Sequence, residues 1–208
     1  MDELQQKIVD YVEANGKTYQ QIALEIHEKP EVSNYEFFAS KRLADQIKSV
    51  GFEVEMPAAG HRTGFAASYK SGKPGPVMVF LAEYDALVGL GHGCGHNLFG
   101  ATSSLAAAAL KSVIDEVGGE VRLYGTPGEE GGDAPFTKEF CSLLPANMIK
   151  IMWYNRFLLA TLLFVSAKKR IRWNFRGKEK MTRRSLQHVH GNTLYIHALV
   201  TEVLTTEL

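Results

Sequence analysis

Apolar residues in the first 50 positions recur with the spacing of helices. Residues 3–27 carry them at intervals of three and four, which predicts an amphipathic helix with a weak point or break at Gly16. A second helix is expected to start at Ser33 and Glu36, which have the spacing of a capping box, and to end at Gly51. The chain therefore begins with two helices.

Strand patterns follow the two helices. Residues 52–56 alternate between apolar and polar positions, residues 65–69 read as a short strand, and residues 77–82 form a continuous apolar run typical of a buried strand. Residues 97–114 are rich in Ala and Leu and predict a helix, and residues 121–124 predict the next strand. The order strand, helix, strand predicts an α/β fold with a mainly parallel sheet.

A cysteine and a histidine stand two residues apart in a glycine-rich stretch. Residues 91–97 read Gly-His-Gly-Cys-Gly-His-Asn, so that Cys94 and His96 are flanked by permissive backbone. Thiolate and imidazole are good ligands for zinc and similar metals. From these residues alone, a buried cysteine and a core or capping histidine in a turn is an equally good interpretation.

Carboxylates occupy the ends of two predicted strands. Glu129 and Glu130 follow the strand at 121–124, and Asp85 follows the strand at 77–82. One carboxylate of an adjacent pair can bind a metal while the other acts as general base, and a strand-end Asp can ligate a metal or orient a histidine ligand. Taken singly, a solvated acidic loop and a turn Asp explain these residues as well. Because ligands bind at the carboxyl ends of strands in such sheets, all the groups together predict a hydrolytic centre with one or two metal ions.

The same segments resemble the aminoacylase and carboxypeptidase G family of metallopeptidases, the M20 family. The resemblance rests on residues 26–31, 81–87, 91–97 and 125–132, which occur in the family's order. It is strongest to the amidohydrolase branch that includes aminobenzoyl-glutamate hydrolase and aminoacylase-like dipeptidases. The family usually has Pro at position 88 and Ala at positions 93 and 128, where this chain has Val, Gly and Gly.

The resemblance implies a role for each of these residues. Cys94, His96 and Glu130 match metal ligands, Glu129 matches the general base that takes a proton from metal-bound water, and Asp85 matches a position behind the ligands. The implied cofactor is zinc, with manganese or cobalt as alternatives, and the implied substrates are small N-acyl amino acids or dipeptides. The implied fold is a three-layer α/β catalytic domain that dimerises through an inserted lid domain. A hydrolase that uses Cys94 as nucleophile is the alternative, but it gives Glu129 and Glu130 no role.

The composition changes sharply near residue 150. Residues 1–150 hold 13 Lys and Arg against 20 Asp and Glu, whereas residues 151–208 hold 10 against 3 and contain no Pro. We expect residues 1–140 to form the first part of the catalytic domain and residues 141–208 an atypical, poorly packed tail, in which 160–179 resemble the start of the lid domain. The family's further histidine ligands have no counterpart there, since His188, His190 and His197 lie outside matching motifs. We therefore expect the hydrolase activity to be impaired in this chain, and a non-catalytic, truncated or frame-shifted product is the alternative.

The charge and hydropathy of the chain limit the kinds of binding partner and the cellular location that can be expected. The net charge is zero, so no bulk electrostatic attraction to nucleic acid or to a membrane is expected. The longest apolar run, residues 157–165, is far shorter than the roughly 20 residues of a membrane helix. The N-terminus has no apolar signal region, and Cys94 and Cys141 form no disulfide framework. We therefore expect a cytoplasmic protein.

Overall fold

The computed structural model of the protein describes residues 3–131. Its helices and strands are, in chain order, α1 (Glu3–His27), α2 (Phe37–Ser49), β1 (Glu53–Glu55), β2 (Phe65–Lys70), β3 (Val77–Ala82), α3 (His96–Val117) and β4 (Glu120–Gly125). Every helix and strand expected up to residue 124 is present. The predictions for Cys141, for the tail and for residues 160–179 lie outside the described residues.

The four strands form one sheet in the order β1-β2-β4-β3. β4 pairs parallel with β3 and antiparallel with β2, and β2 pairs antiparallel with β1. The α/β class is confirmed, but the described part of the sheet is mixed rather than mainly parallel. The cause is the short turn at residues 71–76, which reverses the chain so that β3 runs opposite to β2. The crossover through α3 then inserts β4 between them, parallel to β3.

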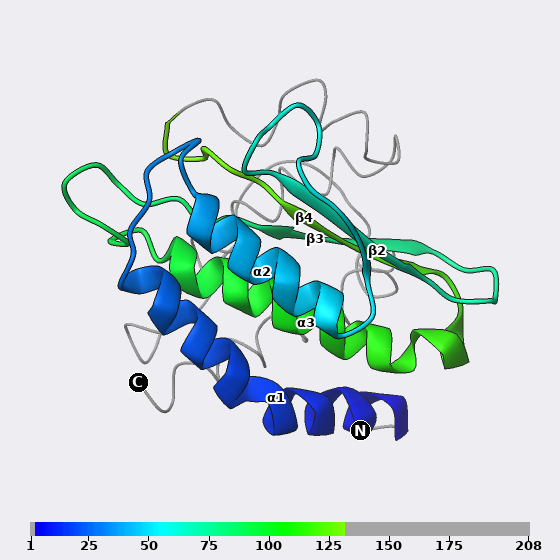
Figure 1. The fold of residues 1–208 in the computed structure, drawn as a ribbon. Coiled ribbons are helices and arrows are strands. Elements are labelled where there is room, and N and C mark those ends of the chain that lie inside the picture. Colours follow the sequence, from blue (N-terminus) through cyan, green and yellow to red (C-terminus); the bar gives the residue numbers. More distant parts are fainter. Residues whose placement is uncertain (1–2, 132–208) are drawn as a thin grey trace, which may run out of the picture.

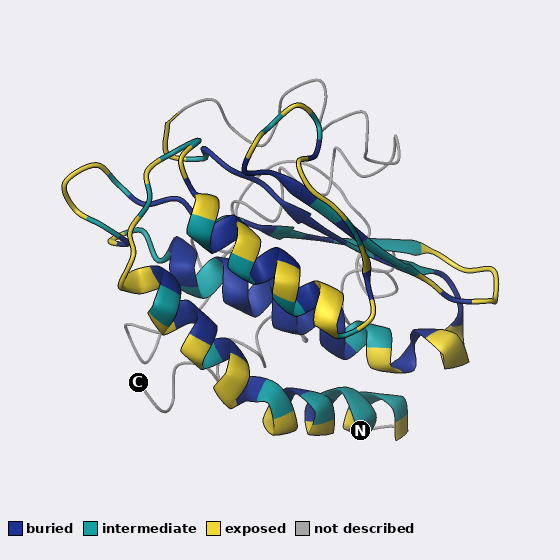
Figure 2. Ribbon diagram, viewed as in Figure 1, coloured by how far each residue is buried: buried dark blue, intermediate teal, exposed yellow. Residues whose placement is uncertain are grey.

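Helices cover one face of this sheet (Figure 1). α3 packs on β3 and β4, α2 packs beside it on β2, and α1 packs against α3. Because α3 lies between α1 and the sheet, it is buried on several sides, and the alanines at positions 106–109 have no exposed surface (Figure 2). None of the helices in residues 3–131 is long and apolar enough to cross a membrane.

Two details of the helices differ from the sequence-based expectation. Gly16 is buried and α1 is not broken there: the helix is continuous from Glu3 to His27, although it bends in its middle (Figure 1). Ser33 and Glu36 do not form a capping box; instead, the carboxylate of Glu31 accepts hydrogen bonds from the backbone N–H groups of Phe38 and Ala39 at 2.9–3.0 Å. The start of α2 is thus capped from outside the expected box, and Ser33 and Glu36 are available for other contacts.

Strand β3 is less buried than its apolar sequence suggested. Only Phe80 and Ala82 are buried, and the other four residues are half-buried. β3 lies at the edge of the described sheet, which leaves one of its sides without a partner strand among residues 3–131.

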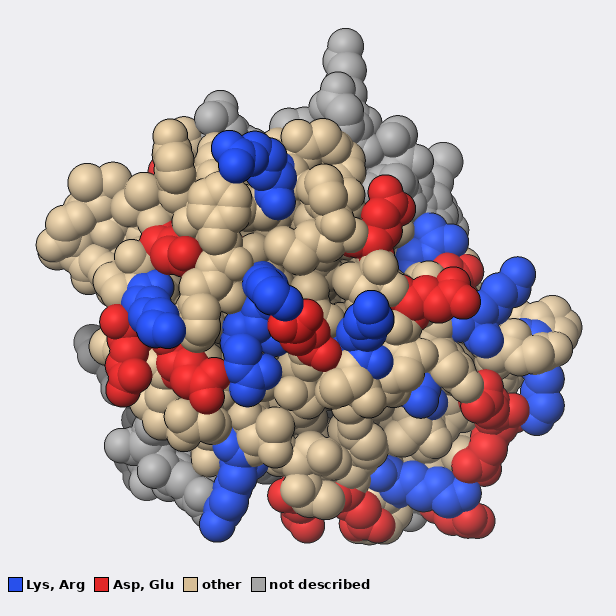
Figure 3. Space-filling view, in the orientation of Figure 1, with Lys and Arg blue, Asp and Glu red and all other residues tan. Residues whose placement is uncertain are grey.

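Acidic and basic side chains are mixed on the helical face of the molecule (Figure 3). Ion pairs join Lys41 to Asp45 and Arg42 to Glu25 at 2.7 Å. On this face, the described residues therefore form no large surface of a single charge, in line with the neutral overall charge.

Close packing of β2 against β4 requires glycine at position 125. Gly125 faces Phe65 across the antiparallel pair, and a Cβ atom at position 125 would lie 2.1 Å from the Phe65 ring. We expect Gly125→Ala to lower the free energy of unfolding by about 1–3 kcal/mol, the typical cost of overpacking a core. Urea denaturation of the variant measures this loss.

Gly72→Ala is the matched control, because a Cβ atom at the exposed Gly72 would meet nothing within 4 Å. Its effect on the free energy of unfolding should stay within about 0.5 kcal/mol. Equal stabilities of the two variants would show that the ring of Phe65 moves aside without cost.

Candidate metal centre

Three segments of the chain meet at the carboxyl ends of β3 and β4. In the parallel pair, Ala82 lies opposite Gly125, and the N–H of Thr126 donates a 2.9 Å hydrogen bond to the carbonyl of Ala82. The residues that follow each strand, 83–85 and 126–131, therefore leave the sheet side by side. The third segment is the start of α3, where Gly95 adopts the left-handed conformation (φ +87°) that glycine favours and the helix begins at His96.

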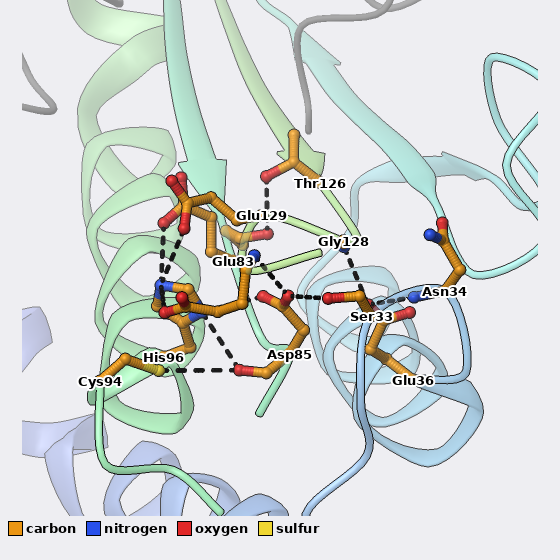
Figure 4. A network of polar contacts seen from close by, with 12 residues as sticks. Ser33, Asn34, Glu36, Glu83, Asp85, Cys94, His96, Thr126, Gly128 and Glu129 are labelled. Atoms are coloured by element: carbon orange, nitrogen blue, oxygen red, sulfur yellow. Dashed lines mark hydrogen bonds and ion pairs between the residues drawn. The ribbon is translucent and has the colours of Figure 1, made fainter. Parts of the chain in front are cut away.

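Asp85 fixes the orientation of His96 (Figure 4). The Nδ1 atom of His96 lies 2.9 Å from Oδ1 and 3.1 Å from the backbone carbonyl of Asp85. Both of these oxygens are acceptors, so Nδ1 carries the proton and donates it. In the neutral ring, the lone pair is then on Nε2, which is the atom that a metal would use.

Carboxylates surround the Nε2 atom of His96. The nearest oxygens of Glu83, Glu130 and Glu129 lie 3.4, 3.8 and 3.9 Å from this nitrogen. Glu83 and Glu129 are half-buried, with 19% and 12% of their side-chain surface exposed, whereas Glu130 is an exposed residue whose side chain is 25% exposed. Three carboxylates around one imidazole nitrogen form an environment that attracts a cation.

The donor atoms in this environment fit a transition metal. The ligand atoms of Cys94, His96 and Glu130 all lie within 4.8 Å of one another, and so do those of Glu83, His96 and Glu129. Zinc ligands lie about 2.0–2.3 Å from the ion, so the ligands of one ion must come this close together. The structure thus brings Cys94, His96 and Glu130 together, as predicted. The two groups share His96, whose one free ring nitrogen, Nε2, can bind a single ion.

Glu83 lies in the site, although the sequence analysis gave a role at this strand end to Asp85 alone. It follows β3 directly and lies closer to His96 Nε2 than either member of the Glu129 and Glu130 pair. Its position at the strand end, two residues before Asp85, was the available signal. That signal did not distinguish it from any other polar residue that ends a strand.

The ionisation of Asp85 and His96 reflects their contact. Burial favours a higher pKa for Asp85, but hydrogen bonds from His96, the Glu130 N–H and Ser33 bring that pKa below its ordinary value. Burial favours a lower pKa for His96, but Asp85 and the nearby carboxylates raise that pKa above its ordinary value. In the metal-free protein the two groups therefore stabilise each other's charged forms.

The environment of Cys94 argues against a thiolate nucleophile. Burial raises the pKa of the Cys94 thiol to about 11, and the neighbouring carboxylates act in the same direction. Nucleophilic cysteines have a lowered pKa, and they commonly lie beside an imidazole that acts as base. Here the thiol donates a weak hydrogen bond to the carbonyl of Asp85, at 3.8 Å, and the neighbouring His96 ring is held by the Asp85 carboxylate.

Asp85 also connects the histidine to the acidic loop. Its Oδ2 atom accepts hydrogen bonds from the Ser33 hydroxyl at 2.7 Å and from the Glu130 N–H at 2.8 Å. Its Oδ1 atom accepts the hydrogen bond from His96. The buried carboxylate can accept all three hydrogen bonds because both of its oxygens are acceptors.

Asp85→Asn is therefore expected to weaken zinc binding by about 10–100-fold, as is typical when the partner of a histidine ligand is lost. The side-chain amide of asparagine would place an N–H donor where the Asp85 carboxylate now accepts hydrogen bonds, so that two donors would face each other. Competition titration against a chelator measures the change in affinity.

Asp115→Asn is the control for this variant, because Asp115 accepts a hydrogen bond from Tyr69 at the exposed end of α3. Native zinc affinity in the Asp85→Asn variant would show that His96 does not need this partner.

Comparison with known proteins relates the chain to metal-dependent peptidases and amidohydrolases. It is 40% identical to one of the subunits of p-aminobenzoyl-glutamate hydrolase from Escherichia coli, over 64% of this chain and 31% of that protein. It is 37% identical to mouse Xaa-Arg dipeptidase, over 39% of this chain and 23% of that protein, and 30% identical to N-acetyl-L-cysteine deacetylase of Bacillus subtilis, over 51% and 29%. No family model matches the chain.

Solved structures give the same relationship. A dinuclear metal-binding peptidase of the M20 family from Bacillus subtilis superposes with a TM-score of 0.54 at 26% identity, over 58% of this chain and 37% of that one. An aminohydrolase from Staphylococcus aureus superposes with a TM-score of 0.52 at 28% identity, over 59% and 34%. The resemblance to the M20 family and its amidohydrolase branch is thus confirmed, and the chain spans about a third of the length of these relatives.

Proposed function

We propose that this chain carries the first part of the catalytic centre of a metal-dependent hydrolase that cleaves the amide bond of small N-acyl amino acids or dipeptides. The observation that carries the proposal is the convergence of thiol, imidazole and carboxylate at one edge of the sheet. Cys94, His96 and Glu130 would hold the metal, with Glu83 as a further ligand.

Glu129 is the general base in this proposal. Its carboxylate is 3.9 Å from His96 Nε2 and only 12% exposed, so it lies beside the ligand atoms rather than in bulk solvent. It takes the proton of the attacking water and passes it to the leaving amine. The metal, when bound, acts as Lewis acid on the substrate carbonyl and lowers the pKa of the water.

The donor set favours zinc over harder cations. A thiolate and an imidazole suit zinc, whereas the additional carboxylates are also compatible with manganese or cobalt. The relative of known structure that binds two metals supports a second ion, for which Glu83 is a candidate ligand.

The substrate class follows from what the relatives have in common. Their names refer to three kinds of compound: p-aminobenzoyl-glutamate, a dipeptide and N-acetyl-cysteine. Each of these compounds contains an amide bond to the nitrogen of an amino acid. Dimer formation and a cytoplasmic location remain predictions.

Metal analysis of the purified protein, combined with a screen of N-acyl amino acids and dipeptides, tests the proposal. We expect about one or two zinc ions per chain and hydrolysis that a chelator removes and added zinc restores. A protein with neither metal nor hydrolysis would instead be a non-catalytic product, and hydrolysis that resists chelators would point to Cys94 as nucleophile.

A further inference from the structure

A segment far from the metal centre in sequence lies directly against its acidic loop. Residues 33–36, which we call segment 33–36, precede α2, and residues 126–131, which we call loop 126–131, carry Glu129 and Glu130. Glu36 is completely buried, and its Oε1 atom accepts hydrogen bonds at 2.8 Å from the backbone N–H groups of Asn34 and Gly128. Its Oε2 atom accepts a hydrogen bond from the Thr63 hydroxyl, also at 2.8 Å. A single carboxylate thus joins the segment to the loop (Figure 4).

Ser33 provides a second connection to the same loop. Its hydroxyl donates to Asp85 Oδ2, and that oxygen also accepts the N–H of Glu130. The backbone N–H groups of Gly128 and Glu130, on either side of Glu129, are therefore both held by buried carboxylates.

Side chains of the segment also fill the space beside the two glycines of the loop. A Cβ atom at Gly128, which has φ +75°, would lie 3.1 Å from the side-chain nitrogen of Asn34. A Cβ atom at Gly131 would lie 2.6 Å from the Cβ of Ser33. The loop can lie this close to the segment because both positions lack a side chain.

We infer that segment 33–36 is the positioning element of the acidic loop, and that Glu36 acts as a positioning residue that sets Glu129 and Glu130 through the Gly128 N–H. The inference rests on the proposed function for what the loop does, but the hydrogen bonds that carry it are independent of any metal. A fully buried carboxylate is costly to keep, and burial raises the pKa of Glu36. The Glu36 carboxylate accepts hydrogen bonds from the Asn34 N–H, the Gly128 N–H and the Thr63 hydroxyl together because it has two acceptor oxygens.

Three variants separate positioning from stability. Glu36→Ala removes the acceptor, whereas Glu36→Gln keeps an Oε1 oxygen of the same reach for the two N–H groups. Glu31→Ala is the matched control, because it removes a carboxylate that caps α2 and that forms no described hydrogen bond to the loop. Each variant is made in the full chain.

Two measurements are made on each variant: amide hydrogen exchange of loop 126–131 without metal, and zinc affinity by competition with a chelator. Glu36→Ala should speed exchange at Gly128 about tenfold, because the N–H loses its acceptor. It should also weaken zinc binding by about 10–100-fold. Glu36→Gln should restore both properties, and Glu31→Ala should lower the melting temperature and leave both unchanged.

The inference is overturned if Glu36→Ala leaves loop exchange at the native rate, or if Glu31→Ala weakens zinc binding to the same extent. Absence of zinc binding in the native chain would contradict the proposed function instead. The exchange measurement would then still decide whether Glu36 holds the loop.

Discussion

In a form of the protein that carries the whole catalytic centre, Glu129→Gln is expected to leave zinc bound and to lower amide hydrolysis by about 10²–10⁴-fold, the usual cost of losing a general base. Glutamine has the shape of glutamate and cannot take a proton, and the hydrogen bonds of the Gly128 and Glu130 N–H groups go to Glu36 and Asp85. Hydrolysis of an N-acyl amino acid, measured together with the zinc content of the same sample, tests both parts of the expectation.

Glu28→Gln is the control, because Glu28 is exposed just after α1 and its substitution makes the same chemical change away from the site. Native hydrolysis in Glu129→Gln would remove Glu129 from the role of base. Loss of zinc together with hydrolysis would make Glu129 a ligand of the second group of donors, with Glu83 and His96.

Cys94→Ala is expected to weaken zinc binding by more than about 100-fold, since loss of a direct ligand exceeds the 10–100-fold effect of losing a partner behind one. The sulfur lies within 4.8 Å of the ligand atoms of His96 and Glu130, and no other thiol occurs among residues 3–131. Competition titration measures the affinity, and the thiolate absorption of the cobalt-substituted protein should disappear with the sulfur.

Cys141→Ala is the matched control, since Cys141 lies outside the described residues and outside the ligand motif. Equal loss of zinc in both variants would contradict the assignment of Cys94. If Cys94→Ala kept zinc and lost hydrolysis, the result would support the alternative in which Cys94 is the nucleophile, despite the raised pKa of its thiol.

The sequence by itself determined the elements and most of the candidate site residues. Helical and strand periodicities depend on which face of an element is apolar, and this is a local property, so the elements up to residue 124 were predicted at nearly their observed positions. Cys94 and His96 were singled out by their glycine-rich loop, and Glu129 and Glu130 because they follow β4 at the edge of the sheet where ligands bind.

The tertiary structure alone decided how these parts are connected. The sheet is mixed because β4 lies between β2 and β3. The apolar pattern of a single strand does not show which strands will be its neighbours. Glu31 caps α2, and Glu36 holds the Gly128 N–H from 92 positions away along the chain. Glu83 is likewise part of the candidate site only because the fold brings its carboxylate to 3.4 Å from His96 Nε2. Hydrogen bonds between distant residues leave no periodic trace in a sequence, because each depends on the packing that brings donor and acceptor together.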